Sequence, residues 1–372
     1  MSSCKVVVAT GIYPPDVGGT ATYARMLVEG LPRHGVEPVL LRFSAFLGLP
    51  RGLRHVLFLQ RILALGRRAE VLFSLDPVSV GLPMLLAARI LRRPLVLRVG
   101  GDYAWEQGVE RFGVEEDLDQ FLRKRYGWKV EWLRRIERLV ARGAVRVIVP
   151  AQYFRTVLQY WGTRDDQITV IHNAFDISDV PGSQAEAQGR LGLRGRWVVS
   201  AGRLLRLKGF GTLIEAFAGL KGELPDVHLA ILGSGPQYKV LAETIDRAGL
   251  GESVRLVGAA PHPQVLMYMK AADLFVLNSA AEGMSNAIME AMAVGTPVIA
   301  TRAGGNSELI EDGKSGRLVS PNRPDELRGA MHHLLSHPDQ ARSLAEQARG
   351  SLARFAKDDM VRLTASALLA AR

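Results

Sequence analysis

The sequence predicts an α/β protein built from two Rossmann-like, doubly wound parallel sheets, one in each half of the chain. Short apolar runs typical of buried parallel strands alternate with helical patterns between Lys5 and His172, and the alternation restarts at Trp197. A polar segment, 178–187, separates the two series, as a domain junction would. The length of 372 residues also exceeds what one ordinary core holds. We therefore expect an N-terminal domain over 1–175 and a C-terminal domain over 176–355.

The composition is that of a globular protein with a surplus of basic residues in its first half. Hydrophobic residues make up 48% and charged residues 23%. Residues 1–180 hold 25 Lys or Arg against 18 Asp or Glu, a net +7, whereas the remainder holds 22 against 19, a net +3. This surplus favours an anionic partner such as a phospholipid surface or a phosphorylated substrate. Nucleic acid is not expected, because no basic tail or basic low-complexity tract occurs.

The N-terminus and the single cysteine indicate the compartment. A strand begins after four residues, without the layout of a signal peptide, and Cys4 alone excludes an internal disulfide or a cysteine-cluster metal site. The longest apolar region, 78–91, is interrupted by Pro83 and Arg89 and is too short to span a bilayer. We expect a cytoplasmic protein, peripheral on the inner face of the cell membrane.

The first strand, Lys5–Ala9, leads into a glycine-containing loop, Tyr13–Gly19, and then a helix over 20–32. In this layout bare backbone at Gly18 and Gly19 can approach a phosphate or a sugar at the helix start. A plain tight turn explains the same two glycines. Further strands are expected at 38–42, 71–74 and 95–99, with helices near 53–66 and 79–91.

Two carboxylates follow the strand at 95–99, where ligands collect in sheets of this kind. They are Asp102 and Glu106, in the segment Gly100–Glu106. Asp102 is therefore a candidate catalytic residue. The alternative is that Asp102 caps a helix starting nearby.

Residues 118–141 form one long helical pattern with Gly127 as a weak point. One face is apolar, and the other gathers Trp128 and Trp132 with basic residues, namely Lys124, Arg134, Arg135 and Arg138. Trp and Arg on one outward face are typical of a helix resting on an anionic membrane. The alternative is a solvated basic face with the Trp rings tucked under a loop. A strand at 145–150, a helix at 152–161 and a strand at 168–172 complete the first half.

The second half begins with a strand, Trp197–Ala201, followed by the loop Gly202–Gly209 and a helix over 211–220. Arg203 and Lys208 on this loop form a plausible clamp for a diphosphate, because Arg offers a bidentate fork and Lys a point charge. A strand over 227–232 ends in a second loop, Gly233–Pro236. The strand at 254–258 ends where the backbone of Val257 and Gly258 could bind a base.

The segment after the strand Leu274–Leu277 carries two carboxylates on either side of a helix start. Glu282 lies on the loop, Ser285 or Asn286 can cap the helix, and Glu290 lies about one turn into it. Free backbone N–H groups at the helix start suit a phosphate. A nucleotide sugar has hydroxyls on both sides of a diphosphate and fits this arrangement; a capped helix with two solvated Glu is the alternative. A strand over 297–300, the loop Gly304–Glu308 and terminal helices follow.

Taken together, the loop Tyr13–Gly19, the pair Arg203 and Lys208, the pair Glu282 and Glu290, and the loop Gly304–Glu308 resemble the retaining glycosyltransferases of family 4. The resemblance covers essentially the whole chain. It implies the GT-B fold, in which two Rossmann-like domains face each other across a cleft. It also implies that the last helix, 356–372, crosses back to the N-terminal domain.

The resemblance further implies roles for these residues. Arg203 and Lys208 would hold the donor diphosphate, Glu290 the ribose hydroxyls and Glu282 the hexose hydroxyls, while Asp102 would lie near the anomeric carbon on the acceptor side. Other residues would complete the donor site: Gly18, Gly19, Gly233, Val257, Gly258, Gly283, Met284, Ser285 and Asn286. The cations would stabilise the departing diphosphate, so no metal and no cofactor beyond the nucleotide sugar is expected.

The sequence therefore predicts transfer of a hexose from a UDP- or GDP-sugar to a lipid-linked or glycan acceptor, with retention, in the synthesis of cell-envelope glycans. A nucleotide-sugar 2-epimerase on the same fold is the alternative. A NAD-dependent oxidoreductase needs a Gly-X-Gly-X-X-Gly fingerprint, which neither Gly18-Gly19 nor Gly233-Ser234-Gly235 completes. A basic nucleic-acid-binding module is the last alternative, and it predicts steeply salt-dependent binding to DNA or RNA.

Overall fold

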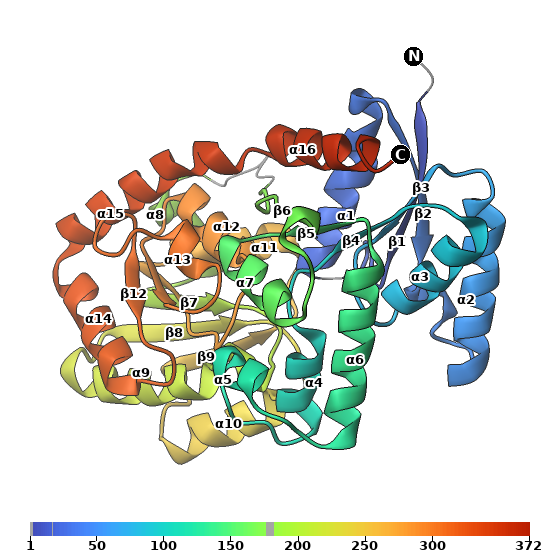
Figure 1. Ribbon diagram of the computed structural model, residues 1–372. Helices are drawn as coiled ribbons and strands as arrows, with labels where there is room; N and C mark the ends of the chain where they lie inside the picture. The colour runs from blue at the N-terminus through green and yellow to red at the C-terminus, as the bar shows by residue number, and fades with distance from the viewer. Residues whose placement is uncertain (1–2, 17, 176–181) are drawn as a thin grey trace. The chain divides into compact units, whose positions relative to one another are not determined.

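The computed structural model describes residues 3–16, 18–175 and 182–372 (Figure 1). The chain divides into two compact units, unit 1 with Met1–Ala174 and Phe355–Arg372, and unit 2 with Phe175–Arg354. The predicted boundaries were 175/176 and 355/356. Val17 of the predicted Tyr13–Gly19 loop and the predicted start of the second domain at Asp176 lie outside the described residues.

Unit 1 contains a six-stranded parallel sheet with the order β2-β1-β3-β4-β5-β6. Its strands are β1 (Cys4–Thr10), β2 (Val36–Arg42), β3 (Val71–Ser74), β4 (Leu95–Arg98), β5 (Arg146–Val149) and β6 (Ile168–Val170). β1 lies between β2 and β3, so the strand order reverses there, as in doubly wound folds. The predicted sheet of the first half is confirmed.

The helices of unit 1 include the C-terminal one, which packs against the first (Figure 1). They are α1 (Gly19–Gly30), α2 (Arg51–Gly66), α3 (Gly81–Leu91), α4 (Tyr103–Arg111), α5 (Leu118–Arg123), α6 (Trp128–Gly143), α7 (Gln152–Tyr160) and α16 (Lys357–Leu369). Met360, Val361 and Leu368 of α16 are buried in the core of unit 1. The Tyr23 hydroxyl of α1 lies 3.4 Å from Thr364 Oγ1. The last helix therefore belongs to the N-terminal unit, as the family resemblance implied.

The prediction of one helix over 118–141 is wrong, because α5 and α6 are separate helices. α5 ends at Arg123, since Lys124 is extended, and Gly127 with ψ 156° begins α6 as its N-cap. The prediction that Arg134 lies on the outward face is also wrong, because its side chain is buried. Trp128 and Trp132 are 76% and 57% exposed, so the Trp rings are not tucked under a loop.

Unit 2 contains a second six-stranded parallel sheet, with the order β12-β11-β10-β7-β8-β9. Its strands are β7 (Arg196–Ala201), β8 (Val227–Leu232), β9 (Val254–Gly258), β10 (Leu274–Leu277), β11 (Val298–Thr301) and β12 (Arg317–Val319). This is the 3-2-1-4-5-6 order of dinucleotide-binding folds, and it reverses between β7 and β10. The fold class predicted from the sequence is thus confirmed for both units.

Eight helices accompany the described part of this second sheet. They are α8 (Gln184–Leu191), α9 (Phe210–Glu223), α10 (Tyr238–Arg247), α11 (His262–Ala271), α12 (Asn286–Val294), α13 (Asn306–Leu309), α14 (Pro324–Ser336) and α15 (Pro338–Ser351). α8 begins inside the segment predicted to be a polar junction, because Ser183 and Glu186 form a capping box around its first turn. Within the described ranges, every helix is too short or too polar to cross a membrane.

Candidate functional site

Four loops of unit 2 meet where its parallel strands end. They follow β7 (202–209), β8 (233–236), β10 (278–285) and β11 (302–305). β7 and β10 are neighbours at the point where the strand order reverses. In open α/β sheets this is the position at which ligands bind.

Glycines allow these loops to touch through bare backbone. A Cβ atom at Gly233 would overlap the carbonyl oxygen of Gly202, and one at Gly304 would overlap that of Glu282. Gly209, at φ +64°, packs in the same way against the carbonyl of Asn278. Backbone hydrogen bonds then join the loops: Gly305 N donates to Glu282 O at 2.9 Å, and Ala280 N donates to Leu207 O at 2.8 Å. The four loops therefore form one connected structure.

Lys208 and Glu282, assigned from the sequence to diphosphate and hexose, form an ion pair in this structure. Lys208 ends a short 3₁₀ turn, Arg206–Lys208, after β7, and Glu282 lies on the loop after β10. Their side chains are only 17% and 12% exposed, so solvent screens the pair less than it screens a surface pair. A cation and a carboxylate thus stand together at the switch point of the sheet.

The helix start predicted after Glu282 is present. Ser285 is the N-cap of α12 and accepts a hydrogen bond from Ile288 N at 3.4 Å, and Gly295 closes the helix in the left-handed conformation. Met284 and Ser285 are buried, whereas Gly283 and Asn286 are half-buried. The N-terminus of α12 therefore lies beside the Lys208–Glu282 pair, with its positive dipole end in the same loop cluster.

Glu290 lies within α12 and faces His262, a residue that the sequence analysis did not single out. His262 Nε2 is 3.0 Å from Glu290 Oε1, and the side chains are 52% and 17% exposed. His262 is the first residue of α11, directly after the N-cap Pro261. Local sequence contains no signal for this contact, because the packing of α11 against α12 creates it.

The remaining predicted donor residues lie on neighbouring loops of unit 2. Gly233 N donates to Gly258 O at 2.8 Å, which places the ends of β8 and β9 side by side, and Val257 is half-buried. Arg203 is exposed and forms no ion pair with another described residue. Its guanidinium is thus available to an anion, on the loop that also carries Lys208.

In unit 1, Gly18 and Gly19 stand at the start of α1. Gly18 is its N-cap with φ +154°, and its carbonyl accepts Ala21 N at 3.0 Å. A Cβ at Gly18 would lie 3.0 Å from Ile12 Cδ1. Both interpretations of the pair, ligand approach and tight turn, are compatible with this geometry.

Asp102 adopts the geometry of the helix cap that was the alternative to a catalytic role. It is 1% exposed and is the N-cap of α4. Oδ1 accepts Trp105 N at 2.8 Å, and Oδ2 accepts Trp161 Nε1 at 3.2 Å. Burial raises the pKa of Asp102, against these two hydrogen bonds, which lower it. The catalytic role of Asp102 stays a prediction.

Glu137 of α6 is buried next to Asp102 and holds the same helix start. Its Oε1 accepts Tyr103 N at 2.7 Å, and both carboxylate oxygens lie 3.3 Å from Ala104 N. Burial, together with the negative charge of Asp102, raises the pKa of Glu137 well above its ordinary value. The start of α4 is therefore held by two neighbouring buried carboxyl groups.

No group of three His, Cys, Asp or Glu side chains gathers as a metal site among the residues with described positions. The sequence contains one Asp-X-Asp triplet, in which Asp117 caps α5 through Gln120 N at 2.8 Å and Asp119 accepts the Tyr153 hydroxyl at 2.9 Å.

Two family models match the chain, one to each half. "Glycosyltransferase Family 4" matches residues 17–179 and "Glycosyl transferases group 1" matches residues 185–351. A D-inositol 3-phosphate glycosyltransferase from Corynebacterium urealyticum is 35% identical over 202 residues, 51% of this chain and 48% of the relative. A GDP-mannose-dependent alpha-(1-6)-phosphatidylinositol monomannoside mannosyltransferase from Mycolicibacterium smegmatis is 32% identical over 177 residues, 45% of this chain and 46% of the relative. Each match thus spans about half the length of the curated relative.

Among solved structures, Anabaena HepE in complex with UDP and glucose matches with a TM-score of 0.79 and 22% identity. The match covers 98% of this chain and 99% of that chain. At this identity the likeness concerns the fold, which the two chains share over nearly their whole length.

Proposed function

Since the chain belongs to the family 4 glycosyltransferases of the GT-B fold, we propose that it transfers a hexose from a UDP- or GDP-sugar to a lipid-linked or glycan acceptor. The observation that carries the proposal is the Lys208–Glu282 ion pair in the loop cluster at the switch point of unit 2, with Glu290 farther along on α12. The names of the relatives support a sugar donor, because one is GDP-mannose-dependent and one structure holds UDP and glucose.

The diphosphate of the donor is assigned to the cationic side of this cluster. Arg203 and Lys208 lie on one loop after β7, beside the N-terminus of α12. The nucleoside diphosphate gains negative charge as it departs, and fixed cations and helix N–H groups stabilise that charge. With the cations in this role, the proposed reaction requires no metal.

The sugar and the ribose are assigned to the two carboxylates. Glu282 is in contact with Lys208, so a hexose held by Glu282 would have its anomeric oxygen next to the cation that binds the phosphate. Glu290 lies farther along α12 and would accept hydrogen bonds from the ribose hydroxyls. The contact with His262 fixes the side of α12 on which this carboxylate is presented.

We assign a retaining course to the reaction, with the acceptor attacking on the face that the diphosphate leaves. The carboxylate nearest to Lys208, Glu282, is paired with that cation, and this pairing suits hydroxyl binding better than nucleophilic attack. Asp102 is proposed to support the acceptor side through the start of α4, which it caps. A change in the hydrogen bonds of Asp102 would be needed before it could take a proton from an acceptor.

Binding to the inner face of a membrane is proposed for the exposed face of α6. Trp128 and Trp132 are exposed there, one turn apart, and Arg135 and Leu139 continue the same face. Amphipathic Trp rings next to Arg are suited to the interface of an anionic bilayer. An acceptor carried by a lipid would then be within the plane to which the enzyme is bound.

The test is thermal stabilisation by UDP, GDP and ADP, followed by the matching sugar nucleotides. A ligand at one hundred times its Kd should add about 2.7 kcal/mol to the free energy of unfolding. One of the three nucleoside diphosphates should stabilise the protein clearly more than the other two. A transfer assay with the matching labelled sugar nucleotide should then give labelled glycan or lipid product. Absence of any shift would reject the donor site, and release of free nucleotide without acceptor would favour an epimerase.

A further inference from the structure

Unit 1 contains a cavity whose lining is almost entirely cationic. It has a volume of about 440 Å³ and lies between the C-terminal end of α5, the connection 124–127 and the part of α6 from Glu131 to Arg138. Its lining includes one carboxylate, Glu131, and six cations, namely Arg123, Lys124, Arg125, Arg134, Arg135 and Arg138. The roles assigned to the donor site use none of these residues.

Two of the six cations already have partners. Lys124 Nζ is 2.8 Å from Glu116 Oε1. Arg134 is buried, forms an ion pair with Glu131 Oε1 at 2.9 Å, and donates to the carbonyl oxygens of Phe121 and Lys124. Its guanidinium also stacks 3.9 Å from the centre of the Phe121 ring. These contacts make Arg134 a structural support rather than a free charge.

Arg134 and Glu131 together hold the wall of the cavity in place. Glu131 Oε1 also accepts Tyr126 N at 3.1 Å, and the rings of Phe121 and Tyr126 stack with centres 4.8 Å apart. The connection between α5 and α6 is therefore tied to α6 at both its ends. Because this wall is already ordered, a ligand that binds to its cations loses little free energy to ordering of the chain.

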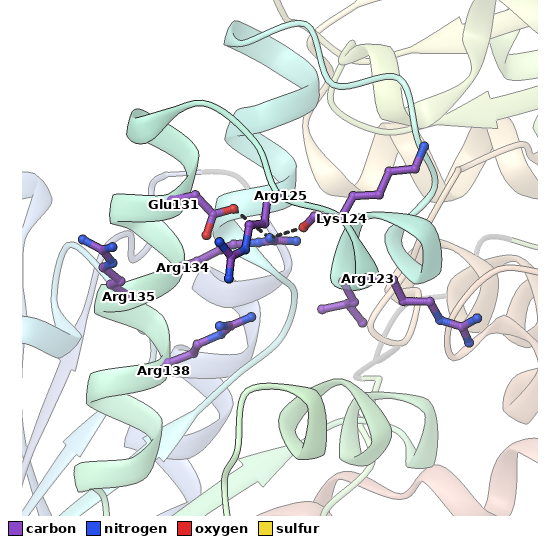
Figure 2. Close-up of a pocket in the computed structure, with 8 residues that line it drawn as sticks. Arg123, Lys124, Arg125, Glu131, Arg134, Arg135 and Arg138 are labelled. Carbon is purple, nitrogen blue, oxygen red and sulfur yellow. Dashed lines mark hydrogen bonds and ion pairs between the residues drawn. The ribbon is translucent and has the colours of Figure 1, made fainter.

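The other four cations form no ion pair with any residue in the described parts of the chain. Figure 2 shows Arg134 and Arg138 leaving α6 on the side of α5, with Arg125 in front of Arg134. Arg135 leaves α6 on the other side in this view and lines a second cavity of about 450 Å³ together with Arg138, Arg89 and Arg142. Moreover, the Nε of Arg138 is buried without a hydrogen-bond partner in the described structure. Guanidinium groups that line one cavity without an ion pair favour an anion within it.

We propose that this cavity binds the phosphate or diphosphate group of a ligand, separately from the diphosphate site of unit 2. Guanidinium groups bind phosphate oxygens through pairs of N–H donors, and several such forks suit a multiply charged group. A soluble phosphorylated compound and a phospholipid headgroup present the same group to the cavity.

The test measures binding of inorganic pyrophosphate by calorimetry and of vesicles by sedimentation. All proteins carry Lys208→Ala, so that anion binding through the proposed clamp of unit 2 is weakened equally in all of them. The test variant is Arg123→Ala/Arg125→Ala, whose two side chains are exposed. The matched control is Arg67→Ala/Arg68→Ala, which removes the same charge from exposed positions after α2. Vesicles contain phosphatidylglycerol in phosphatidylcholine, or phosphatidylcholine alone.

Loss of about tenfold or more in pyrophosphate affinity in the test variant, with the control unchanged, would support the site with a soluble ligand. Loss of anionic-vesicle binding in the test variant alone, without pyrophosphate binding in any protein, would support it with a headgroup. Equal binding by the test and control variants, or no binding to either probe, would overturn the proposal. Arg138→Gln provides a second variant, expected to weaken binding in the same direction. Because the readout is binding, the result does not depend on sugar transfer.

Discussion

His262 Nε2 lies 3.0 Å from Glu290 Oε1, and this contact joins the first residue of α11 to the middle of α12. The two residues are 28 positions apart in the chain, and only the packing of the two helices brings them together. The carboxylate is mostly covered and the imidazole is half exposed. The contact therefore orients Glu290 while leaving it within reach of a ligand.

Glu290→Ala should abolish transfer and leave the melting temperature nearly unchanged. The carboxylate is proposed to bind ribose. Its partner His262 is half exposed, so solvent screens the pair, and screened pairs contribute about 0–1 kcal/mol to stability. Initial-rate kinetics and a thermal melt check both parts. His262→Ala is the companion variant, expected to raise the donor KM more than it lowers kcat. Full activity of Glu290→Ala would remove the ribose assignment.

Lys208→Ala should lower the transfer rate by about 10²–10³, if losses at oxyanion-type donors apply here. It should also cost stability, by about 1–3 kcal/mol, because Glu282 would remain mostly buried without its cation. Adding Glu282→Gln to the same protein should restore most of the stability and none of the activity. Urea unfolding and a transfer assay separate the two effects.

The control for Lys208 is Lys314→Ala in the same unit. Lys314 also forms an ion pair, with Glu311, but both side chains are at least 60% exposed. Its removal should change neither rate nor stability measurably. A rate loss in both variants would point to a general charge effect instead of a clamp.

Transfer activity should persist in EDTA. The proposed cations and the N-terminus of α12 supply the positive charge that a divalent ion would otherwise supply to the diphosphate. The assay compares initial rates before and after dialysis against the chelator, with added Mg²⁺ or Mn²⁺ as the reverse test. Strict dependence on either ion would contradict the clamp formed by Arg203 and Lys208.

Glu137→Gln should flatten the dependence of stability on pH. Because its pKa in the folded protein is raised well above the ordinary 4.5, the folded state retains a proton that the unfolded chain releases. The stabilisation that Glu137 contributes to the free energy of unfolding is thus fully present below the pKa of the unfolded chain. It is lost as the pH rises through the pKa of Glu137 in the folded protein. Between these two pKa values the free energy of unfolding falls by up to about 1.4 kcal/mol per pH unit for one such group.

The Gln side chain keeps an oxygen that can accept Tyr103 N and Ala104 N, so α4 should remain folded in this variant. Urea midpoints between about pH 5 and pH 8 give the slope, with Glu243→Gln on an exposed face of α10 as the control. Identical slopes for wild type and Glu137→Gln would show that Glu137 does not hold this proton.

Trp128→Ser/Trp132→Ser should weaken sedimentation with phosphatidylglycerol vesicles and leave the melting temperature unchanged. Both rings are mainly exposed, so they contribute little to the core and much to an interface. Tyr238→Ser, at a ring that is 46% exposed on α10, is the control. Equal sedimentation of all three proteins would remove the membrane proposal.

Local patterns were sufficient for the strands and for the loop and helix at 282–290. β10 and β8 coincide with the predicted ranges, and Ser285, one of the two residues predicted as possible caps, is the cap of α12. In these segments apolar run length and capping chemistry decide the structure within a few residues.

Tertiary contacts decided the features that the sequence analysis missed. Arg134 is buried because its guanidinium stacks on the Phe121 ring and donates to the carbonyl oxygens of Phe121 and Lys124. Helical periodicity alone places a charged residue on the solvent face, so it could not predict this burial. The pairing of His262 with Glu290 depends on how two helices pack. The helix cap at Asp102 was the alternative interpretation of the sequence. Its partner Trp161 lies at the end of α7, and local sequence contains no signal for this contact.

The glycine contacts among the four loops of unit 2 have a consequence for enzyme engineering. Gly233 faces the carbonyl of Gly202, and Gly304 faces that of Glu282, without side chains between them to absorb a change in backbone path. A loop grafted alone from a relative would collide with, or separate from, its unaltered neighbours. Attempts to exchange donor preference should therefore transplant the four loops as one cassette, and single-loop chimeras should be recovered mainly as insoluble protein.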